Sequence, residues 1–488
     1  MKLPPVRRSY GLICSIIALF TVANLLILRN FWTPEYPERG ESDSMKPEGS
    51  SHPLITSKDY ESLFNRAAPP LFDTWAQMAT DNHCFTNLSS YDQIYLDLDP
   101  WLSGRRALDI AVVANVTDAL LIRFENGQFN LPEEAWFLDS DLYDAVAHLF
   151  PQNASFTVPV NGFDEPSMVK ADNFTGEYAD MDAVFKHSKC FRDTYAIANS
   201  TKLPPSVRLS AGETKSVRSQ HGFLLQPDTF AVRNGNAPLF SQATAPCFED
   251  IALPLHYHTE AMKKPVKDLV PWEEKQNVLF WRGSTTGGSV RKGTPWSQYG
   301  RFRLMEWARE WGVRNPRRVF DASKESPTVP HPAVSVDVGF SGIVQWDDET
   351  YWNVFDKYGL KGIVYMNQTM RFKYLLVVDG NTWPSRLQEY LQSNSVVLYN
   401  GLFQDLYIGQ LVPWVHYVPI RMDYSDLEDK LEWLVANDDK AKQIAINAQN
   451  LAKRWSTRGQ FECYIGLLMM EYGNLFAQPA NLNISIIR

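Results

Sequence analysis

Two short stretches of this 488-residue chain combine glycine, hydroxyl and arginine side chains in a way that suits phosphate binding. The first is WRGSTTGGSVRKG at 281–293, which continues an apolar run that predicts a strand. Glycines let backbone N–H groups approach an anion, hydroxyl groups add donors, and the Arg282 guanidinium can hold two phosphate oxygens. The spacing matches neither G-x-x-x-x-G-K-S/T nor G-x-G-x-x-G, which excludes the standard kinase, ATPase and dinucleotide-binding motifs. An ordinary solvated surface loop is the alternative.

The second stretch is VVDGNTWPSRLQEYL at 377–391, in which an apolar run leads into Asp379 and Gly380. Ser385 and Arg386 then open a helical segment, and a helix N-terminus beside an arginine again suits an anion. Because ligands of open α/β sheets bind at the carboxyl ends of the strands, the two stretches together indicate one nucleotide-phosphate site. A tight turn with a surface arginine is the alternative.

Asp164 is the candidate for proton transfer. It follows the strand-like run FTVPV at 156–160 and an Asn-Gly turn. A carboxylate at a strand end can act as a general base. Acidic residues before a proline are also common in turns, so the residues alone leave this role open.

Four short acidic or histidine pairs suggest metal binding less strongly. Asp-x-Asp is typical of metal-dependent sugar-nucleotide enzymes, but three copies in an acidic chain show how readily the pattern arises. His256 and His258 would need a third ligand from elsewhere, which favours a packed or hydrogen-bonded pair. The acidic pairs are Asp97 with Asp99, Asp139 with Asp141, and Asp180 with Asp182.

The elements that must position these groups alternate between strand-like and helical stretches. This alternation favours an α/β fold with a doubly wound, mostly parallel sheet in a domain at 266–440. Its expected strands lie at 278–283, 373–380, 395–399 and 415–420, and its helical stretches include 301–312 and 385–392. An earlier α/β domain is expected at 71–265, with apolar runs such as FTVPV and GFLLQ (222–226), and a helical tail is expected at 441–488.

The first seventy residues differ in composition from the rest. Residues 11–28 carry no charge and follow Lys2, Arg7 and Arg8. This pattern predicts a transmembrane anchor at 11–28 behind a cytosolic tail at 1–10, with type II topology and a lumenal head. A cleaved signal peptide is the alternative. Residues 29–70, rich in Pro, Glu, Ser and Gly at their start, are expected to form a flexible stem.

Composition and modification motifs suit a globular head in the Golgi or endoplasmic reticulum. With 44% hydrophobic residues and a net charge of −9, the chain is neither disordered nor suited to bulk nucleic-acid binding. The four cysteines beyond the anchor predict two disulfides in one of three pairings, and they are Cys84, Cys190, Cys247 and Cys463. Seven Asn-x-Ser/Thr sequons predict N-glycosylation, at Asn87, Asn115, Asn153, Asn173, Asn199, Asn367 and Asn483.

Taken together, the motifs resemble glycosyltransferase family 90, the capsule-associated glycosyltransferases, which includes fungal xylosyltransferases and Rumi-type protein O-glucosyltransferases. The similarity extends from about residue 83 to 475. An earlier element, Asp97-Leu98-Asp99-Pro100-Trp101, resembles a family motif and accounts for that Asp-x-Asp pair without a metal. The strongest matches are Trp281-Arg282-Gly283-Ser284, the segment from Lys373 to Arg386, and Pro413 to Pro419 followed by Asp423 and Ala436-Asn437-Asp438-Asp439.

The resemblance implies a GT-B architecture, in which two Rossmann-like domains face each other across a cleft and the C-terminal one binds the sugar nucleotide. It implies Asp164 as the general base, with Arg282 and Arg386 on the diphosphate. It further implies a Cys84–Cys463 disulfide, and with it Cys190–Cys247. The expected donor-binding set is Arg282, Gly283, Ser284, Thr285, Asp379, Gly380, Ser385, Arg386 and Asp423.

The sequence departs from the family near the expected donor pocket. Tyr399 stands where fungal relatives often carry lysine, and Thr382-Trp383-Pro384 replaces a commonly smaller stretch before Arg386. These departures bear on which sugar is bound more than on the class of reaction.

The expected function is an inverting glycosyltransferase that moves a sugar, xylose or glucose, from a UDP-sugar to a hydroxyl of a glycan or glycoprotein. No metal or other cofactor is expected, because guanidinium and N–H groups can stabilise the leaving diphosphate. The main alternative is a catalytically inactive, lectin-like or scaffolding protein of the same fold. A metal-dependent transferase of the other common architecture is a third possibility.

Overall fold

The computed structural model describes residues 54–116, 119–170, 181–196, 217–228, 237–324 and 333–477. The chain divides into two compact units, at 1–53 and 54–488, and the described residues all belong to the second. The predicted tail at 1–10, the anchor at 11–28 and the first part of the stem lie outside them. Within the described ranges, no helix is both long and apolar enough to cross a membrane.

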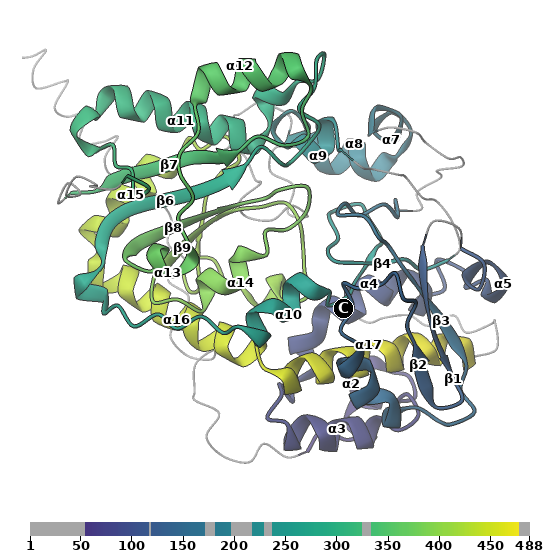
Figure 1. Cartoon of the computed structure of the whole chain (residues 1–488). Helices are drawn as coiled ribbons and strands as arrows, with labels where there is room; N and C mark the ends of the chain where they lie inside the picture. The colour runs from purple at the N-terminus through teal and green to yellow at the C-terminus, as the bar shows by residue number, and fades with distance from the viewer. Residues whose placement is uncertain are drawn as a thin grey trace, which may run out of the picture. The chain divides into compact units, whose positions relative to one another are not determined.

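The described chain is a mixed α/β structure with two separate five-stranded sheets, as Figure 1 shows. The strands are β1 (Leu120–Glu125), β2 (Gln128–Asn130), β3 (Phe156–Val160), β4 (Phe240–Ser241), β5 (Ile251–Ala252), β6 (Gln276–Ser284), β7 (Ser335–Gly342), β8 (Phe372–Val378), β9 (Val396–Asn400) and β10 (Val418–Pro419). The helices of the first part are α2 (Ser57–Phe64), α3 (Phe72–Asp81), α4 (Asp92–Leu102), α5 (Ile110–Val113), α6 (Ser140–Val146), α7 (Met181–His187), α8 (Lys189–Ala196), α9 (Gly222–Leu225) and α10 (His256–Lys263). Those of the second part are α11 (Gly300–Arg314), α12 (Asp348–Tyr358), α13 (Met366–Thr369), α14 (Arg386–Leu391), α15 (Leu427–Ala436), α16 (Asp438–Trp455) and α17 (Arg458–Ala477).

The C-terminal sheet is parallel throughout, in the order β10-β9-β8-β6-β7. Every residue of β8 and β9 is buried, which explains their mostly apolar sequences; Lys373 of β8 is the charged exception and pairs with Asp438 at 2.7 Å. From β6 the chain builds β7 on one side and then returns to the other side for β8, β9 and β10. The doubly wound parallel sheet predicted here is confirmed, and its order reverses between β6 and β8, where such sheets bind ligands.

The N-terminal sheet, in the order β2-β1-β3-β4-β5, is mixed. β1 pairs antiparallel with both β2 and β3, whereas β3, β4 and β5 are parallel. The β1–β2 turn is Asn126-Gly127, and both residues have positive φ, as a tight hairpin requires. This part is α/β as predicted, and the antiparallel pairings of its described strands are confined to β1, which a two-residue hairpin joins to β2 and which also pairs with β3. The run GFLLQ forms the short helix α9.

Part of the predicted stem is folded. Residues 57–64 form α2, and its Tyr60 is fully buried. The Tyr60 hydroxyl donates to Glu471 Oε1 at 2.7 Å, and Arg66 pairs with the other Glu471 oxygen at 2.7 Å. These contacts attach the segment before residue 70 to α17, so it cannot serve as a flexible spacer.

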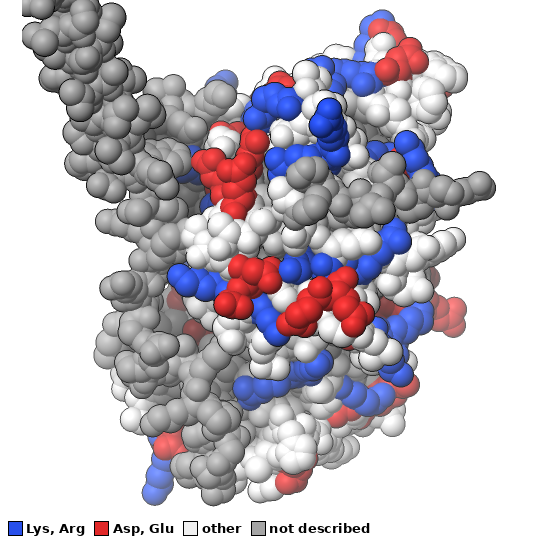
Figure 2. All heavy atoms as spheres, turned by 90° about the vertical axis from the view of Figure 1, so that its left-hand side faces the viewer, with Lys and Arg blue, Asp and Glu red and all other residues white. Residues whose placement is uncertain are grey.

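The described surface of the C-terminal part carries both signs of charge. Figure 2 shows basic and acidic side chains interspersed on one face, with neither sign dominating. The described side chains on this face therefore form no large patch of positive charge that would attract a polyanion.

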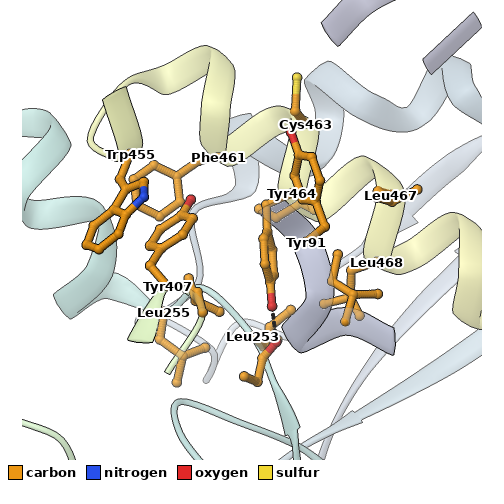
Figure 3. Close-up of a cluster of buried hydrophobic side chains, with 14 of the residues drawn as sticks. Tyr91, Leu253, Leu255, Tyr407, Trp455, Phe461, Cys463, Tyr464, Leu467 and Leu468 are labelled. Atoms are coloured by element: carbon orange, nitrogen blue, oxygen red, sulfur yellow. Dashed lines mark hydrogen bonds between the residues drawn. The ribbon is translucent and has the colours of Figure 1, made fainter. Parts of the chain in front are cut away.

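Helix α17 lies within the N-terminal part although it is the last helix of the described chain. It packs against α3, α4 and α6. Figure 3 shows Tyr464 of α17 beside Tyr91, with its hydroxyl donating to the Ala252 carbonyl at 3.4 Å. Tyr407 stacks on Trp455 at 4.9 Å in the same cluster. One aromatic core therefore joins the two ends of the described chain.

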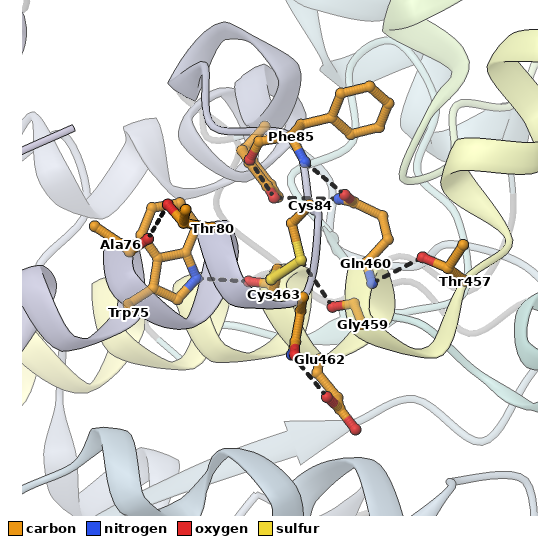
Figure 4. The surroundings of a disulfide bond; sticks show 12 residues. Trp75, Ala76, Thr80, Cys84, Phe85, Thr457, Gly459, Gln460, Glu462 and Cys463 are labelled. Carbon is orange, nitrogen blue, oxygen red and sulfur yellow. Dashed lines mark hydrogen bonds between the residues drawn. A yellow bond between two sulfur atoms is a disulfide. The ribbon is translucent and has the colours of Figure 1, made fainter. Parts of the chain in front are cut away.

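Both expected disulfides are present, Cys84–Cys463 and Cys190–Cys247. The first joins residues 379 positions apart and sits where α17 meets α3. Figure 4 shows Trp75 Nε1 donating to the Cys463 carbonyl at 2.9 Å beside it. The pairing that the resemblance implied is confirmed.

A buried carboxyl in this core gives a test by pH. Asp97 of α4 is buried, and burial raises its pKa to about 8 although the Ala252 N–H and the Gln93 amide donate to it at 2.8 and 2.7 Å. Since the folded-state pKa lies above the usual value of 3.8, the stability that protonated Asp97 contributes is complete below about pH 4 and is lost as pH rises through about 8. We expect Asp97 to lower the melting temperature progressively between about pH 4 and 8, with no further effect above that range.

Asp97→Asn, which cannot titrate, should show a shallower fall over the same range. Thermal unfolding of both proteins at matched ionic strength measures the difference. Equal slopes would mean that Asp97 does not titrate in this range.

Candidate active site

A pocket opens at the reversal point of the C-terminal sheet. The N-terminal part contributes Asp164, Gln242 and Tyr257 to its wall, and the loop after β6 contributes Thr286. Arg301, the second residue of α11, and the whole segment 380–386 after β8 complete the wall. The two stretches that the sequence marked as anion-binding therefore meet at one site.

Asp164 lies in the loop that follows β3, with its carboxylate held between two amides. Gln242, directly after β4, donates from Nε2 to Asp164 Oδ1 at 3.1 Å. Asn381, after β8, donates from Nδ2 to Asp164 Oδ2 at 3.2 Å. Two neutral donors orient the carboxylate without neutralising it, and the side chain remains exposed to the pocket. This arrangement suits a general base.

A second, buried carboxylate fixes the loop that carries Asp164. Asp250 accepts the N–H groups of Ser167 and Met168, at 3.0 Å to Oδ1 and 2.7 Å to Oδ2, and the Ser241 hydroxyl at 2.7 Å. Burial raises the pKa of Asp250 to about 6, and these donors act in the opposite direction. Asp250 therefore ties the residues after Asp164 to β4, one position before Gln242. It is a positioning residue.

Two guanidinium groups, those of Arg301 and Arg386, also line the pocket. Arg301 donates to the Asp379 carbonyl at 2.9 Å, the Ser284 carbonyl at 3.0 Å and the Thr286 hydroxyl at 2.5 Å. Burial, and then the nearby positive charge of Arg386, lower the pKa of Arg301 to about 9. Arg386 donates to the Arg282 carbonyl. Because these acceptors are uncharged, two like charges remain side by side, which favours an anion between them.

Gly380 permits this approach. A Cβ at this position would lie 2.9 Å from Arg301 Nη2 and 3.1 Å from the Thr286 hydroxyl. A larger residue there would displace the guanidinium from the wall of the pocket.

Arg282 does not reach the pocket, contrary to the prediction. Its guanidinium forms ion pairs with Asp337 at 2.8 Å and Asp321 at 3.1 Å, and it is buried. Successive side chains on a strand point to opposite faces, so Arg282 projects from β6 away from Trp281, whose ring lies 5.8 Å from the Arg301 guanidinium. Arg301 takes the place that the prediction gave to Arg282.

The other expected donor-binding residues divide into two groups. Gly380, Ser385 and Arg386 line the pocket. The carboxylate of Asp379 points into the protein, where it accepts the Leu402 N–H at 2.5 Å and binds His221 Nε2 at 3.2 Å. The remaining expected residues, which shape the loops rather than line the pocket, are Gly283, Ser284, Thr285 and Asp423.

Each of those four has a local role in the structure. A Cβ at Gly283 would meet the Trp281 ring at 2.7 Å. The Ser284 carbonyl anchors Arg301. The Thr285 hydroxyl bonds the Val344 backbone at 2.8 Å, and Asp423 Oδ1 accepts the Ser425 N–H at 3.1 Å in a turn.

The position of Arg301 in the sequence could have predicted its place in the pocket, but nothing in the sequence predicts the amides of Gln242 and Asn381. Arg301 opens the helix that directly follows the glycine-rich loop, so the chain had to return it to the same sheet edge. Gln242, Tyr257 and Asn381 carry no motif, and only the folded chain brings them to Asp164.

The remaining candidate sites are accounted for in different ways. Asp97 is buried under hydrogen bonds, Asp99 pairs with Arg105 at 2.5 Å, and Asp139 pairs with Lys263 at 2.7 Å. Asp180 lies outside the described residues. In the part of the chain that the structure covers, no three His, Cys, Asp or Glu side chains are grouped as metal ligands.

The described sequon asparagines, Asn87, Asn115, Asn153 and Asn367, are all exposed, and Asn173, Asn199 and Asn483 lie outside the described residues.

Comparison with known proteins shows a family that part of the chain resembles. Residues 307–483 match the family described as Glycosyl transferase family 90. The resemblance to family 90 is confirmed. The match includes the segment Gly380–Arg386 and Cys463, whereas Asp164 and Arg301 precede it.

Three curated relatives of this chain are protein O-glucosyltransferases. Protein O-glucosyltransferase 2 of Danio rerio is 35% identical over 106 residues, which is 22% of this chain and 21% of that protein. Protein O-glucosyltransferase 3 of Homo sapiens is 24% identical over 248 residues, 48% of this chain and 42% of the relative. Protein O-glucosyltransferase 1 of Rattus norvegicus is 24% identical over 208 residues, 42% and 44% respectively. The chain thus spans less than half the length of each of these relatives.

Proposed function

We propose that this chain is an inverting glycosyltransferase that moves a sugar from a UDP-sugar to an acceptor hydroxyl. The observation that supports the proposal is the pocket at the sheet reversal, whose lining includes the oriented carboxylate of Asp164 and two arginines, Arg301 and Arg386. A base and an anion site are the two parts that sugar transfer from a nucleoside diphosphate requires.

The chemistry follows from this placement. Asp164 takes the proton of the acceptor hydroxyl as its oxygen forms a bond to the anomeric carbon. The bond from that carbon to the diphosphate breaks, and its electron pair leaves with UDP. Arg301 and Arg386 stabilise the charge that develops on the diphosphate. Because the nucleophile enters from the side opposite the leaving group, the anomeric configuration inverts.

The printed names of the relatives support glucose as the transferred sugar and a protein as one class of acceptor. Xylose remains part of the proposal because the resemblance includes xylosyltransferases. We further propose a GT-B arrangement, with the donor bound mainly by the C-terminal sheet and the acceptor reaching Asp164 from the N-terminal part. An anchor at 11–28 and a lumenal head in the Golgi or endoplasmic reticulum belong to the same proposal.

Metal independence is proposed on the chemistry of the donor site. Two guanidinium groups supply positive charge where the diphosphate leaves, which is the role of a divalent ion in metal-dependent transferases. The head domain should therefore transfer sugar equally well in EDTA and in manganese. Loss of transfer in EDTA with recovery in manganese would favour the metal-dependent alternative.

A donor screen tests the function itself. Residues from 54 onward would be purified and supplied with UDP-glucose, UDP-xylose, UDP-galactose and GDP-mannose in turn. We expect at least one UDP-sugar to raise the melting temperature and to be hydrolysed or transferred. If UDP-sugars bind but none is ever consumed, the inactive, lectin-like alternative is supported, and if none binds, both proposals fail.

A further inference from the structure

Three hydrogen-bond donors beside the pocket are buried without a partner. They are Trp383 Nε1, the Thr382 hydroxyl and His258 Nε2, and no described residue accepts from any of them. A buried polar group without a partner is costly, so such a group in a native structure calls for an explanation such as a bound ligand. Thr382 and Trp383 both line the pocket.

The state of His258 follows from its contacts. The imidazole is fully buried, and burial lowers its pKa to about 3, so the ring is neutral. The Leu255 N–H donates to Nδ1 at 3.2 Å, so the proton of the neutral ring is assigned to Nε2. His258 therefore adds a donor and not an acceptor. Its ring lies 4.2 Å from the Trp383 ring, so it supports, from behind, the part of the pocket wall that Trp383 forms.

The position of this wall points to a particular part of the substrate. Thr382 and Trp383 stand between Gly380 and Arg386 in the segment that, with Arg301, holds the anion site. A group bound here lies next to the diphosphate, and the group attached to the diphosphate of a sugar nucleotide is the sugar. Hydroxyl oxygens of a sugar are the acceptors that the unpartnered donors lack.

We infer that Trp383, supported by His258 and next to Thr382, recognises the transferred sugar, with the indole N–H donating to one of its hydroxyl groups. This inference rests on the proposed function and assigns the choice of sugar to the segment in which the sequence departs from its family. A site built to donate to a substrate hydroxyl discriminates against the analogue that lacks it, because the donor is then left unpaired.

The test pairs a protein change with a substrate change. Trp383→Phe removes the N–H and keeps an aromatic ring on His258. For the wild-type head domain, kcat/KM would be measured with UDP-glucose, UDP-xylose and the four monodeoxy analogues of UDP-glucose. We expect one hydroxyl whose removal lowers kcat/KM by about tenfold or more in the wild type and by about twofold or less in Trp383→Phe.

Trp101→Phe is the matched control. Trp101 is 5% exposed, as is Trp383, and its Nε1 is likewise buried without a partner among the described residues, but it lies on α4 and does not line the pocket. The control should keep the wild-type order and spread of donor preferences even if its stability changes.

The outcomes separate the two proposals. If the wild type processes no UDP-sugar, the proposed function fails. If it does, and Trp383→Phe keeps every deoxy penalty, or Trp101→Phe removes the same penalty, the assignment of Trp383 is overturned.

Discussion

Asp164→Asn should lower the rate of sugar transfer by about 10²- to 10⁴-fold while donor affinity stays within a few-fold of the wild type. The substitution keeps the size of the side chain and removes its ability to take a proton. Asp164 is exposed in the pocket and held by Gln242 and Asn381, so its loss should affect chemistry much more than folding. Single-turnover transfer with a saturating donor measures the rate, and calorimetry with UDP measures the affinity.

Asp356→Asn supplies the control for this variant. Asp356 is an exposed carboxylate on α12 and does not line the pocket, so its loss should leave transfer unchanged. Wild-type transfer by Asp164→Asn would assign the base to another group and remove the central element of the mechanism.

Arg386→Gln should lower kcat/KM by about 10²- to 10³-fold, because the charge on the departing diphosphate then loses one of its two guanidinium partners. Arg309→Gln is the control, since Arg309 lies on the same helix as Arg301 but pairs with Glu306 at 2.9 Å on the surface. Initial rates over a range of donor concentrations give the comparison.

Arg282→Gln should give the opposite pattern. It removes one of the two cations that pair with the buried Asp337, which keeps Lys361 at 2.8 Å, so we expect a loss of about 1.5–3 kcal/mol of stability, whereas the folded molecules retain transfer. If Arg282→Gln lost activity without losing stability, and Arg386→Gln kept its activity, the anion site would have to be moved to Arg282.

The sequence was sufficient to predict those elements whose structure is determined by a local residue pattern. The apolar runs of β6, β8 and β9 are buried on both sides, and a buried parallel strand is rich in apolar residues. Their carboxyl ends then had to share an edge, so the position of the site followed from the order of the elements.

The sequence failed where the answer depends on which face a side chain occupies. Arg282 and Arg301 are the same residue type, and only the alternation along β6 and the return of α11 decide that the first pairs with Asp337 and the second lines the pocket. Gln242 and Asn381 could not be predicted for the same reason, because their amides reach Asp164 only once the chain has folded. The N-terminal sheet was harder still, because β4 and β5 have two residues each and carry no periodic signal.

The placement of α17 sets the order in which this chain can fold during synthesis. The side chains of Trp75 and Tyr60, near the beginning of the described chain, donate hydrogen bonds to Cys463 and Glu471. When the strands of the N-terminal sheet have left the ribosome, α17, which completes their core, has therefore not yet been synthesised. All strands of the parallel sheet at 276–419 precede α17 in the chain. We expect the C-terminal sheet to become compact first. The N-terminal part, although synthesised earlier, should keep aromatic surface exposed to chaperones until α17 emerges from the ribosome.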